Sequence, residues 1–216
     1  DVSHYFQALV AEISGYRGLP VTAWVTPAGE IFFGGHTPFV SIPLRGSGIV
    51  NLQVKTDAGS GEEDVVTQRF IAHVPMLLHP RPRRALVIGW GAGATAASAA
   101  LYPLESLECV EIEPAVYEAA PFFDELSGGL RADERFTITF RDGRNRLLRE
   151  REPWDVIVSE PSNPWPSAVS NLFTREFYEV ALERLAPDGV FGQWFHYYHL
   201  DPPDVKVEVK TFLSVF

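Results

Sequence analysis

The sequence predicts an α/β fold in which parallel strands alternate with helices to form a doubly wound sheet. Two observations carry this prediction. From residue 84 onward, short apolar runs alternate with segments of helical spacing, and their lengths suit strand–helix–strand units. Early in this part, an apolar run at 85–88 leads into Gly89, Gly91 and Gly93, and small residues follow at 94–100. A buried strand, a glycine turn and a helix in this order are typical of the first unit of such a sheet.

The first 64 residues are expected to form a small β-rich region. Short runs rich in β-branched and aromatic residues lie at 21–25, 31–33 and 49–54, and Gly and Pro separate them, as in a small antiparallel sheet. The larger aromatic side chains of this region are expected to form its core, with a dimer surface as the alternative; they are Trp24, Phe32, Phe33 and Phe39.

The second region, residues 65–216, is expected to hold the functional site. It opens with a helix at 65–78 that follows an acidic loop at 57–64 and stops before His79-Pro80. The predicted strands that follow are 85–88, 107–112, 136–140, 154–159 and 189–195. The predicted helices between them are 94–101, 115–123, 144–149 and 174–185. The mixed charges of 144–151 indicate an exposed helix face.

Composition narrows the classes of function. The 216 residues carry a formal net charge of −10, which argues against a nucleic-acid partner. The six histidines have no paired ligand spacing, so no metal site is predicted, and the one cysteine, Cys109, is expected to be a buried apolar residue. No signal peptide or membrane-spanning run is evident. Because the sequence starts at Asp1 rather than Met, we expect a piece of a longer protein.

The glycine turn and a downstream acid predict a nucleoside site. Glycines have no side chains to block a ligand, and the turn directs the N–H groups of the helix N-terminus outward. Glu111 follows 22 residues after Gly89, at the end of the second strand, where a carboxylate can accept hydrogen bonds from ribose hydroxyls. We therefore expect an adenosine-containing ligand, with a purely structural turn as the alternative.

Other candidates follow from the rule that ligands of these sheets bind at the carboxyl ends of the strands. The third strand ends at Asp142-Gly143, where the carboxylate can accept a hydrogen bond from an adenine amino group, cap the next helix, or do both. The fifth strand ends near Gln193 and His196. A lone histidine such as His196 is more often a hydrogen-bonded wall residue than a proton carrier.

The segment after the fourth strand is the second informative one. It runs Ser159-Glu-Pro-Ser-Asn-Pro-Trp165, and its prolines stiffen the backbone. That stiffness is expected to hold Glu160, Asn163 and Trp165 over the mouth of the pocket. The alternative is a rigid turn with Glu160 in solvent.

These pieces, in this order and spacing, resemble the spermidine synthase family, the aminopropyltransferases. The resemblance runs from about residue 64 to about residue 200, and it is closest to spermidine-synthase-like domains that are often fused to membrane-spanning segments. It implies a Rossmann-like sheet of the S-adenosylmethionine-methyltransferase type after a small N-terminal β domain. The family's final antiparallel strand pair is expected to be missing if the chain ends at Phe216. The main pieces are His79-Pro-Arg-Pro-Arg-Arg-Ala-Leu-Val-Ile-Gly, Val110-Glu-Ile-Glu, Asp142-Gly143, Trp154-Asp-Val-Ile-Val, Leu172-Phe-Thr-Arg-Glu-Phe-Tyr178 and the segment Ser159–Trp165.

The resemblance also implies a role for each candidate on the nucleoside side. Gly89, Gly91 and Gly93 would line a sulfonium nucleoside. Glu111 would hold the ribose, and Asp142, with the glycine that follows it, the adenine.

On the substrate side, Glu160 stands where the family has its catalytic aspartate, and Gln193 matches a substrate-side glutamine. The resemblance adds Gln68, Asn163 and Trp165 to the residues that contact the substrate.

Three positions depart from the family. The acid that contacts the aminopropyl amine is Ala92 here, the second acid after the fourth strand is Asn163, and the tyrosine of the preceding helix is Thr67. Losing two negative charges weakens the binding of a polycation. Losing the acid at Ala92 also removes a repulsion against the carboxylate of intact S-adenosylmethionine.

The sequence therefore predicts a cytoplasmic transferase. It would bind decarboxylated S-adenosylmethionine, or S-adenosylmethionine itself, and transfer an aminopropyl group to a small-molecule amine, with Glu160 as the base. A homodimer and a fusion to membrane-spanning segments are further expectations from the resemblance.

Three alternatives stay open. Ser162-Asn-Pro-Trp165 is close to the Asn-Pro-Pro-aromatic motif of amino-methylating enzymes, which favours an S-adenosylmethionine methyltransferase. The glycine spacing with Glu111 also fits a nicotinamide-dependent oxidoreductase, although Asp142-Gly143 argues against it. Ala92 and Asn163 favour a nucleoside-binding sensor without catalytic activity.

Overall fold

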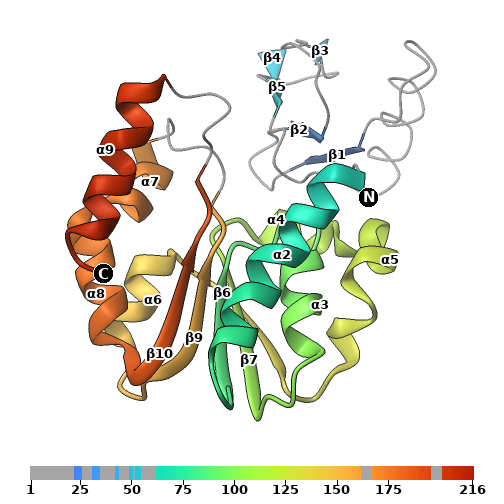
Figure 1. Cartoon of the computed structure of the whole chain (residues 1–216). Helices are drawn as coiled ribbons and strands as arrows, with labels where there is room; N and C mark the ends of the chain where they lie inside the picture. The colour runs from blue at the N-terminus through green and yellow to red at the C-terminus, as the bar shows by residue number, and fades with distance from the viewer. Residues whose placement is uncertain are drawn as a thin grey trace.

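The central element of the fold is a five-stranded parallel sheet with the strand order β10-β9-β6-β7-β8. The computed structural model describes residues 62–161, 167–195 and 201–216, together with short strands between residues 22 and 54. Every neighbouring pair in this sheet is parallel, as predicted. The strands, which end at the upper edge in Figure 1, are β6 (Arg84–Ile88), β7 (Ser106–Glu111), β8 (Phe136–Phe140), β9 (Trp154–Ser159) and β10 (Leu185–Gln193).

The sheet is buried on both faces at its centre. In β6, the residues from Ala85 to Ile88 are each at most 3% exposed, and Val156, Ile157 and Val158 of β9 are 0% exposed. Unbroken apolar runs of this kind are expected where helices cover both faces of a parallel sheet. The lone cysteine, Cys109, is buried within β7, as predicted.

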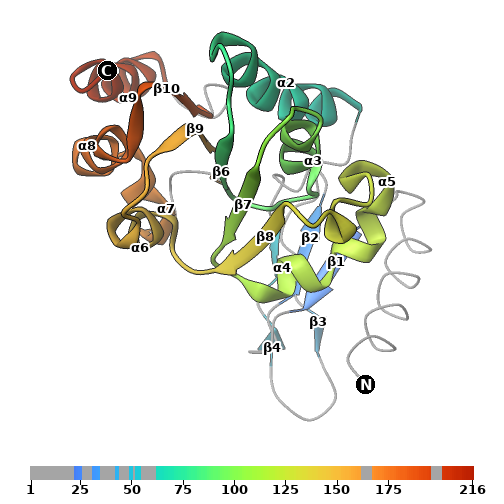
Figure 2. The ribbon, with the colours of Figure 1, turned by 90° about the horizontal axis from the view of Figure 1, so that it is seen from below.

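Helices cover the two faces of the sheet in separate groups (Figure 2). On one face, α2 (Glu62–Leu78) packs against α3 (Ala94–Ala100), and Met76 and Ala99 join the apolar cluster under them. On the other face, α6 (Gly143–Arg149) contacts α8 (Arg175–Glu183), and α9 (Pro202–Leu213) packs on α8. The predicted doubly wound α/β fold is confirmed.

The connection between β7 and β8 differs from the prediction. In place of one helix at 115–123, the chain forms α4 (Pro114–Glu118) and a separate 3-10 turn at Ala120–Phe123. Pro121 lacks the N–H group that a continuous helix would need at that position. Two further short elements complete the connection, α5 (Asp124–Ser127) and a 3-10 turn at Leu130–Ala132.

Other boundaries shifted by a few residues. Helix α2 begins at Glu62, inside the segment predicted as an acidic loop, and β10 begins at Leu185 rather than at residue 189. Between Leu185 and Val190 the register of β10 against β9 is irregular. A short helix, α7 (Ser167–Ser170), and a 3-10 turn at Asn171–Phe173 precede α8. In the part of the chain that the structure describes, no strand follows β10, which forms one edge of the sheet.

The N-terminal strands form two small sheets, and one pairing contradicts the antiparallel prediction. Strand β1 (Thr22–Val25) pairs antiparallel with β2 (Ile31–Gly34), but β2 pairs parallel with β5 (Leu52–Val54). The connection from β2 to β5 is long enough for a parallel crossover, and it includes the antiparallel pair of β3 (Ile42–Pro43) and β4 (Ile49–Val50). The side chains expected to form the core here lie outside the described residues. The domain boundary at residue 64 stays a prediction.

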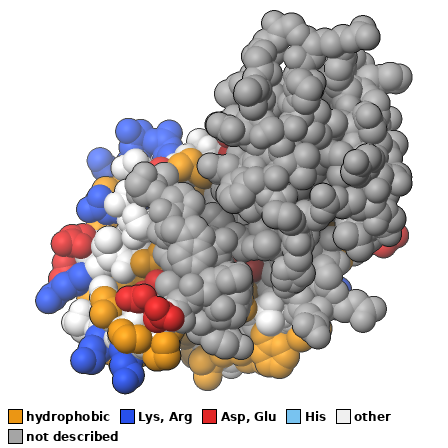
Figure 3. All heavy atoms as spheres, turned by 90° about the horizontal axis from the view of Figure 1, so that it is seen from above, with side chains coloured by type: hydrophobic (Ala, Val, Ile, Leu, Met, Phe, Trp, Pro, Cys, Tyr) orange, Lys and Arg blue, Asp and Glu red, His pale blue; other side chains and the backbone are white. Residues whose placement is uncertain are grey.

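The surface of α2 carries exposed apolar side chains. Val66, Phe70, Leu77 and Leu78 are each more than half exposed. A view from above shows hydrophobic side chains along the lower rim of the described surface (Figure 3). Among the described helices, none has the length and apolar character needed to cross a membrane.

Candidate active site

The glycine turn lies at the carboxyl edge of the sheet, between β6 and α3. Gly89, Gly91 and Gly93 all have positive φ values, of 100°, 52° and 82°. Gly89 is doubly constrained, because a Cβ atom there would lie 2.5 Å from the backbone oxygen of Glu160. The predicted glycine positions are therefore required by the backbone itself.

Trp90, inside the turn, directs its side chain into the core. It is 2% exposed, and its ring lies 5.0 Å from that of Tyr117 and 5.6 Å from that of Phe136, measured between centroids. It belongs to the same apolar cluster as the β6 residue Val87. The large Trp90 side chain therefore leaves the carboxyl edge of the sheet open to a ligand, because it packs into the core below that edge.

Glu111 ties the end of β7 to the glycine turn. One carboxylate oxygen accepts a hydrogen bond from the backbone N–H of Trp90 at 2.9 Å, and the other accepts one from the N–H of Glu113 at 3.0 Å. The residue is only 8% exposed. Its role at the ribose stays a prediction.

Asp142 caps helix α6. Its Oδ1 accepts a hydrogen bond from the backbone N–H of Asn145 at 2.8 Å, so the helix-capping interpretation is confirmed. The next residue, Gly143, packs tightly on β6, because a Cβ atom there would lie 2.6 Å from Cγ2 of Ile88. This contact fixes the start of α6 beside the end of β6. The adenine role of Asp142 stays a prediction.

Glu160 follows β9 and lies over the start of the glycine turn. Its backbone N–H donates to the oxygen of Ile88 at 2.9 Å, which continues the pairing of β9 with β6. Its carboxylate accepts a hydrogen bond from the hydroxyl of Thr95, in the first turn of α3. The Thr95 hydroxyl also lies 3.0 Å from the backbone oxygen of Gln68 on α2, and Gln68 is 7% exposed. Sequence reasoning did not identify Thr95.

The carboxylates of Glu111 and Glu160 act on the buried Cys109 thiol. The pKa of the Cys109 thiol is raised well above its usual value, first by burial and then by the charges of Glu111, Glu160 and Glu108.

Of the remaining predicted residues, the structure describes Gln193. Gln193, at the end of β10, is the register partner of Ser159 and donates its side-chain N–H to the backbone oxygen of Trp194 at 3.1 Å. Asn163, Trp165 and His196 lie outside the described residues. The structure therefore brings together the glycine turn with Glu111, Asp142 and Glu160, while their contacts with a substrate stay predictions.

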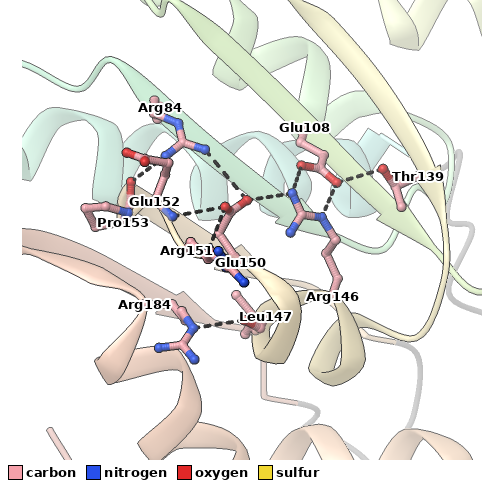
Figure 4. Close-up of polar contacts among 10 residues, drawn as sticks. All are labelled: Arg84, Glu108, Thr139, Arg146, Leu147, Glu150, Arg151, Glu152, Pro153 and Arg184. Atoms are coloured by element: carbon pink, nitrogen blue, oxygen red, sulfur yellow. Dashed lines mark hydrogen bonds and ion pairs between the residues drawn. The ribbon is translucent and has the colours of Figure 1, made fainter.

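A charged cluster lies on the α6 face of the sheet (Figure 4), and it contradicts one prediction. The Arg146 guanidinium donates to Glu108 at 2.6 and 2.7 Å and to Glu150 at 2.7 Å. Its side chain is 19% exposed and that of Glu150 is 13% exposed, so the prediction of an exposed helix face over 144–151 is wrong for these two residues. Glu108 is a charged residue inside a buried strand. Because a buried charge needs a partner, its position in the sequence could have predicted an ion pair here.

The same cluster lines a cavity of about 350 Å³ between β7, β8 and α6. The guanidinium carbon of Arg84 lies 4.4 Å from the ring centre of Trp154 at its wall. Thr139 donates to Glu108 at 2.7 Å. Because the charges lining this cavity pair with one another, we place the candidate active site at the glycine turn instead.

The comparison with protein families decides the assignment of the chain. The family model for the spermine/spermidine synthase domain matches residues 64–215, which include every element from α3 to α9. The chain belongs to the spermine/spermidine synthase family. The family expected from the sequence motifs is thereby confirmed.

Named relatives agree with this assignment. The chain is 35% identical over 133 residues to the polyamine aminopropyltransferase of Streptococcus pneumoniae, which covers 61% of this chain and 46% of that protein. It is 30% identical over 166 residues to the polyamine aminopropyltransferase of Agathobacter rectalis, covering 74% and 58%. The chain thus spans about half the length of the curated relatives it matches.

Among solved structures, the fold is similar to that of a spermidine synthase in complex with the transition-state analogue AdoDATO. The TM-score is 0.70 at 24% identity, over 91% of this chain and 65% of that one. This likeness supports the fold, in agreement with the parallel sheet described above.

Proposed function

We propose that this chain is an aminopropyltransferase that binds decarboxylated S-adenosylmethionine at the glycine turn and transfers its aminopropyl group to an amine. The observation that carries the proposal is the pair of carboxylates at the glycine turn: Glu111 accepts a hydrogen bond from the N–H of Trp90, and Glu160 accepts one from the hydroxyl of Thr95. Both co-substrates of such a reaction are cations at neutral pH, and the carboxylates attract them. The names of the curated relatives support the same activity.

The nucleoside is held by the turn and by the ends of two strands. Because Gly89, Gly91 and Gly93 carry no side chains, the backbone of the turn can approach the ligand closely. Glu111 accepts from the ribose hydroxyls while it continues to bind the N–H of Trp90. Asp142 accepts from the adenine amino group with Oδ2, while Oδ1 caps α6.

Glu160 acts as the base in the transfer. An alkylammonium group has a pKa near 10, so the attacking nitrogen must first lose a proton, and the carboxylate accepts it. The nitrogen lone pair then attacks the methylene carbon beside the sulfonium in line. A C–N bond forms, the C–S bond breaks, and its electron pair stays on sulfur as a neutral thioether. The protein contributes position and charge rather than a covalent intermediate.

The acceptor is proposed to be a small amine that lies against Gln68, Asn163, Trp165 and Gln193. Cytoplasmic location and homodimer formation belong to the same proposal and rest on the family alone. The fusion to membrane-spanning segments stays an expectation from the sequence.

A second candidate function is methyl transfer from intact S-adenosylmethionine, and one observation favours it. Ala92 stands in the glycine turn where the family has an acid, so the carboxylate of the intact donor meets one less negative charge. Calorimetric titration with the two donors separates the candidates. Tighter binding of the decarboxylated form supports aminopropyl transfer, and tighter binding of the carboxylated form supports methyl transfer.

The proposal is tested by the variant Glu160→Gln, which keeps the shape of the side chain and removes the base. We expect turnover of the decarboxylated donor with a diamine to fall at least a hundredfold, since general bases contribute about 10²–10⁴ in rate. Binding of the thioether product should survive. Glu179→Gln, on the exposed face of α8, is the matched control and should keep full activity. Unchanged turnover in Glu160→Gln rules out Glu160 as the base.

A further inference from the structure

We infer that the outer side of α2 is a dimer interface, on which the same helix of a second copy of this chain packs in antiparallel orientation. Helix α2 lies at the outside of the molecule in both views of the ribbon (Figures 1 and 2), and its inner side packs on α3 and β10. The inference gives the homodimer of the proposed function a surface, and it does not depend on the proposed reaction.

Five apolar side chains form a continuous stripe along the outer side of α2. They recur every three or four residues, which places them on one face of the helix. The inner side is apolar as well, since Ala72 and Met76 are at most 1% exposed and belong to the core under the helix. A helix that is apolar all round is expected to be covered on both sides. The outer stripe consists of Val66, Phe70, Val74, Leu77 and Leu78, which are 52%, 64%, 47%, 73% and 69% exposed.

The outer stripe is self-complementary about its midpoint. In an antiparallel pair of α2 helices, a two-fold axis between Phe70 and Val74 sets Phe70 of one copy against Val74 of the other. The same axis sets Val66 against Leu78, and each pair occurs twice. A longer side chain thus meets a shorter one at every pair, so the two stripes can interdigitate. This match favours a second copy of the chain over an unrelated protein.

The charges at the ends of α2 favour the same arrangement. In the sequence, the first turn of the helix reads Glu62-Glu63-Asp64, and the exposed Arg81 follows its last residue. Antiparallel packing brings the acidic end of one helix to the basic end of the other, whereas parallel packing sets like charges side by side. The formal net charge of −10 opposes an anionic lipid surface as the occupant.

The size of the outer stripe fits a homodimer. A standard interface takes about 800 Å² from each partner, and about 65% of a homodimer interface is apolar. Five Val, Leu and Phe side chains exposed to this extent supply several hundred Å² of that apolar part. The exposed Arg69, beside the stripe, belongs to the polar rim that such an interface also needs.

Sedimentation velocity over a range of protein concentrations tests the interface. We expect the wild type to dimerise, and Phe70→Glu to raise the dissociation constant at least a hundredfold, because a charge is then buried without a partner at the centre of the contact. Leu148→Glu is the matched control: Leu148 is 47% exposed on α6, and its substitution should leave dimer formation unchanged. If Phe70→Glu does not fold, Leu77→Glu takes its place.

Two results of this measurement overturn the inference. One is a wild type that stays monomeric at every concentration, including a monomer that sediments with phosphatidylserine vesicles, which would assign the stripe to a membrane. The other is a folded Phe70→Glu that dimerises as tightly as the wild type. Neither readout requires turnover, so a failure of the proposed reaction is detected separately.

Disulfide formation between variants tests the antiparallel orientation. Copies with Phe70→Cys, mixed with copies with Val74→Cys under mild oxidation, should form the mixed disulfide more readily than either forms a disulfide alone. The native Cys109 is buried and does not compete. Phe70→Cys mixed with Leu148→Cys is the control. Equal cross-linking in the two mixtures overturns the orientation and with it the inference.

Arg81→Glu tests the charge complementarity. The dissociation constant of the dimer should rise about tenfold at low salt, and the difference from the wild type should shrink as salt is added. Arg149→Glu, at an exposed position on α6, is the control and should have no effect on the dimer. Tighter dimerisation in Arg81→Glu would indicate that like ends meet, and it would overturn the antiparallel arrangement.

Discussion

Gly89 is constrained both by its backbone conformation and by its close contact with Glu160. Its φ of 100° is unfavourable for a residue with a side chain, and an added Cβ would lie 2.5 Å from the Glu160 backbone oxygen. The close approach of these two segments sets the distance between the nucleoside-binding turn and the proposed base. Gly89 therefore determines how close the glycine turn lies to the proposed base.

Gly89→Ala should destabilise the fold by about 3 kcal/mol, because strain in φ and a backbone clash add together. Gly128→Ala is the matched control: its φ is 57°, but a Cβ there meets nothing within 4 Å. That variant should lose only about 1 kcal/mol. Urea denaturation of both variants measures the difference, and equal losses would show that the contact with Glu160 is unimportant.

Single residues were predictable from the sequence only where a pattern marked them. The glycine spacing marks Gly89 and Gly93, and the position after an apolar run marks Glu111. Thr95 lies in a run of alanines and has no such mark, and its partner Glu160 is 65 positions further on. A hydrogen bond between residues this distant depends on the packing of α3 on the sheet, which no local pattern specifies.

Helix α6 shows how one element can serve both fold and site. Asp142 satisfies the N–H of Asn145 in its first turn, and its place at the end of β8 brings the same carboxylate to the carboxyl edge. Helix α8 starts in the same way, since the Thr174 hydroxyl accepts from the N–H of Phe177 at 3.2 Å. Thr174 has no proposed role at the nucleoside.

Asp142→Ala and Thr174→Ala should each cost about 1 kcal/mol of stability, the usual value of a lost helix cap. Only Asp142→Ala should weaken binding of a thioether nucleoside, because only that residue is proposed to contact the adenine. Thermal denaturation measures the first effect and calorimetry the second. Equal nucleoside affinity in the two variants would remove Asp142 from the site.

Elements with a strong pattern were predicted closely. The bounds of β8 and β9 match the predicted 136–140 and 154–159, because apolar runs between turn residues mark both ends. The helix expected at 115–123 breaks at Ala119, where Pro121 interrupts the hydrogen-bond pattern. The parallel pairing of β2 with β5 could not be read locally, since strand direction depends on how the connection between them folds.

At the scale of the whole molecule, the charged cluster of Figure 4 connects α6 with β6 and β7. Burial disfavours the charge on Glu150, but the N–H groups of Glu152 and Arg151 and the Arg146 guanidinium outweigh it and lower the pKa of Glu150 to about 2. The pKa of Arg146 is raised, first by its hydrogen bond to Glu108. The pairing spans 38 positions of sequence, so the charges alone did not predict it.

This cluster makes stability depend on pH. A carboxyl group whose pKa falls from 4.5 to about 2 on folding stabilises the fold above pH 4.5, and this contribution is lost as the pH falls towards 2. Glu150→Gln should therefore be less stable than the wild type at pH 7, and the difference should shrink between pH 4.5 and 2. Urea denaturation across this range measures it, with Glu179→Gln as the exposed control. A constant difference between wild type and Glu150→Gln would contradict the account.

The most direct test of the central claim is calorimetric titration of the protein with 5′-methylthioadenosine, a thioether nucleoside, in the wild type and in Glu111→Ala. The account predicts one bound nucleoside per chain in the wild type and at least tenfold weaker binding in a folded Glu111→Ala variant, since two ribose hydrogen bonds are lost. No binding to the wild type, or equal affinity in the two proteins, would contradict it.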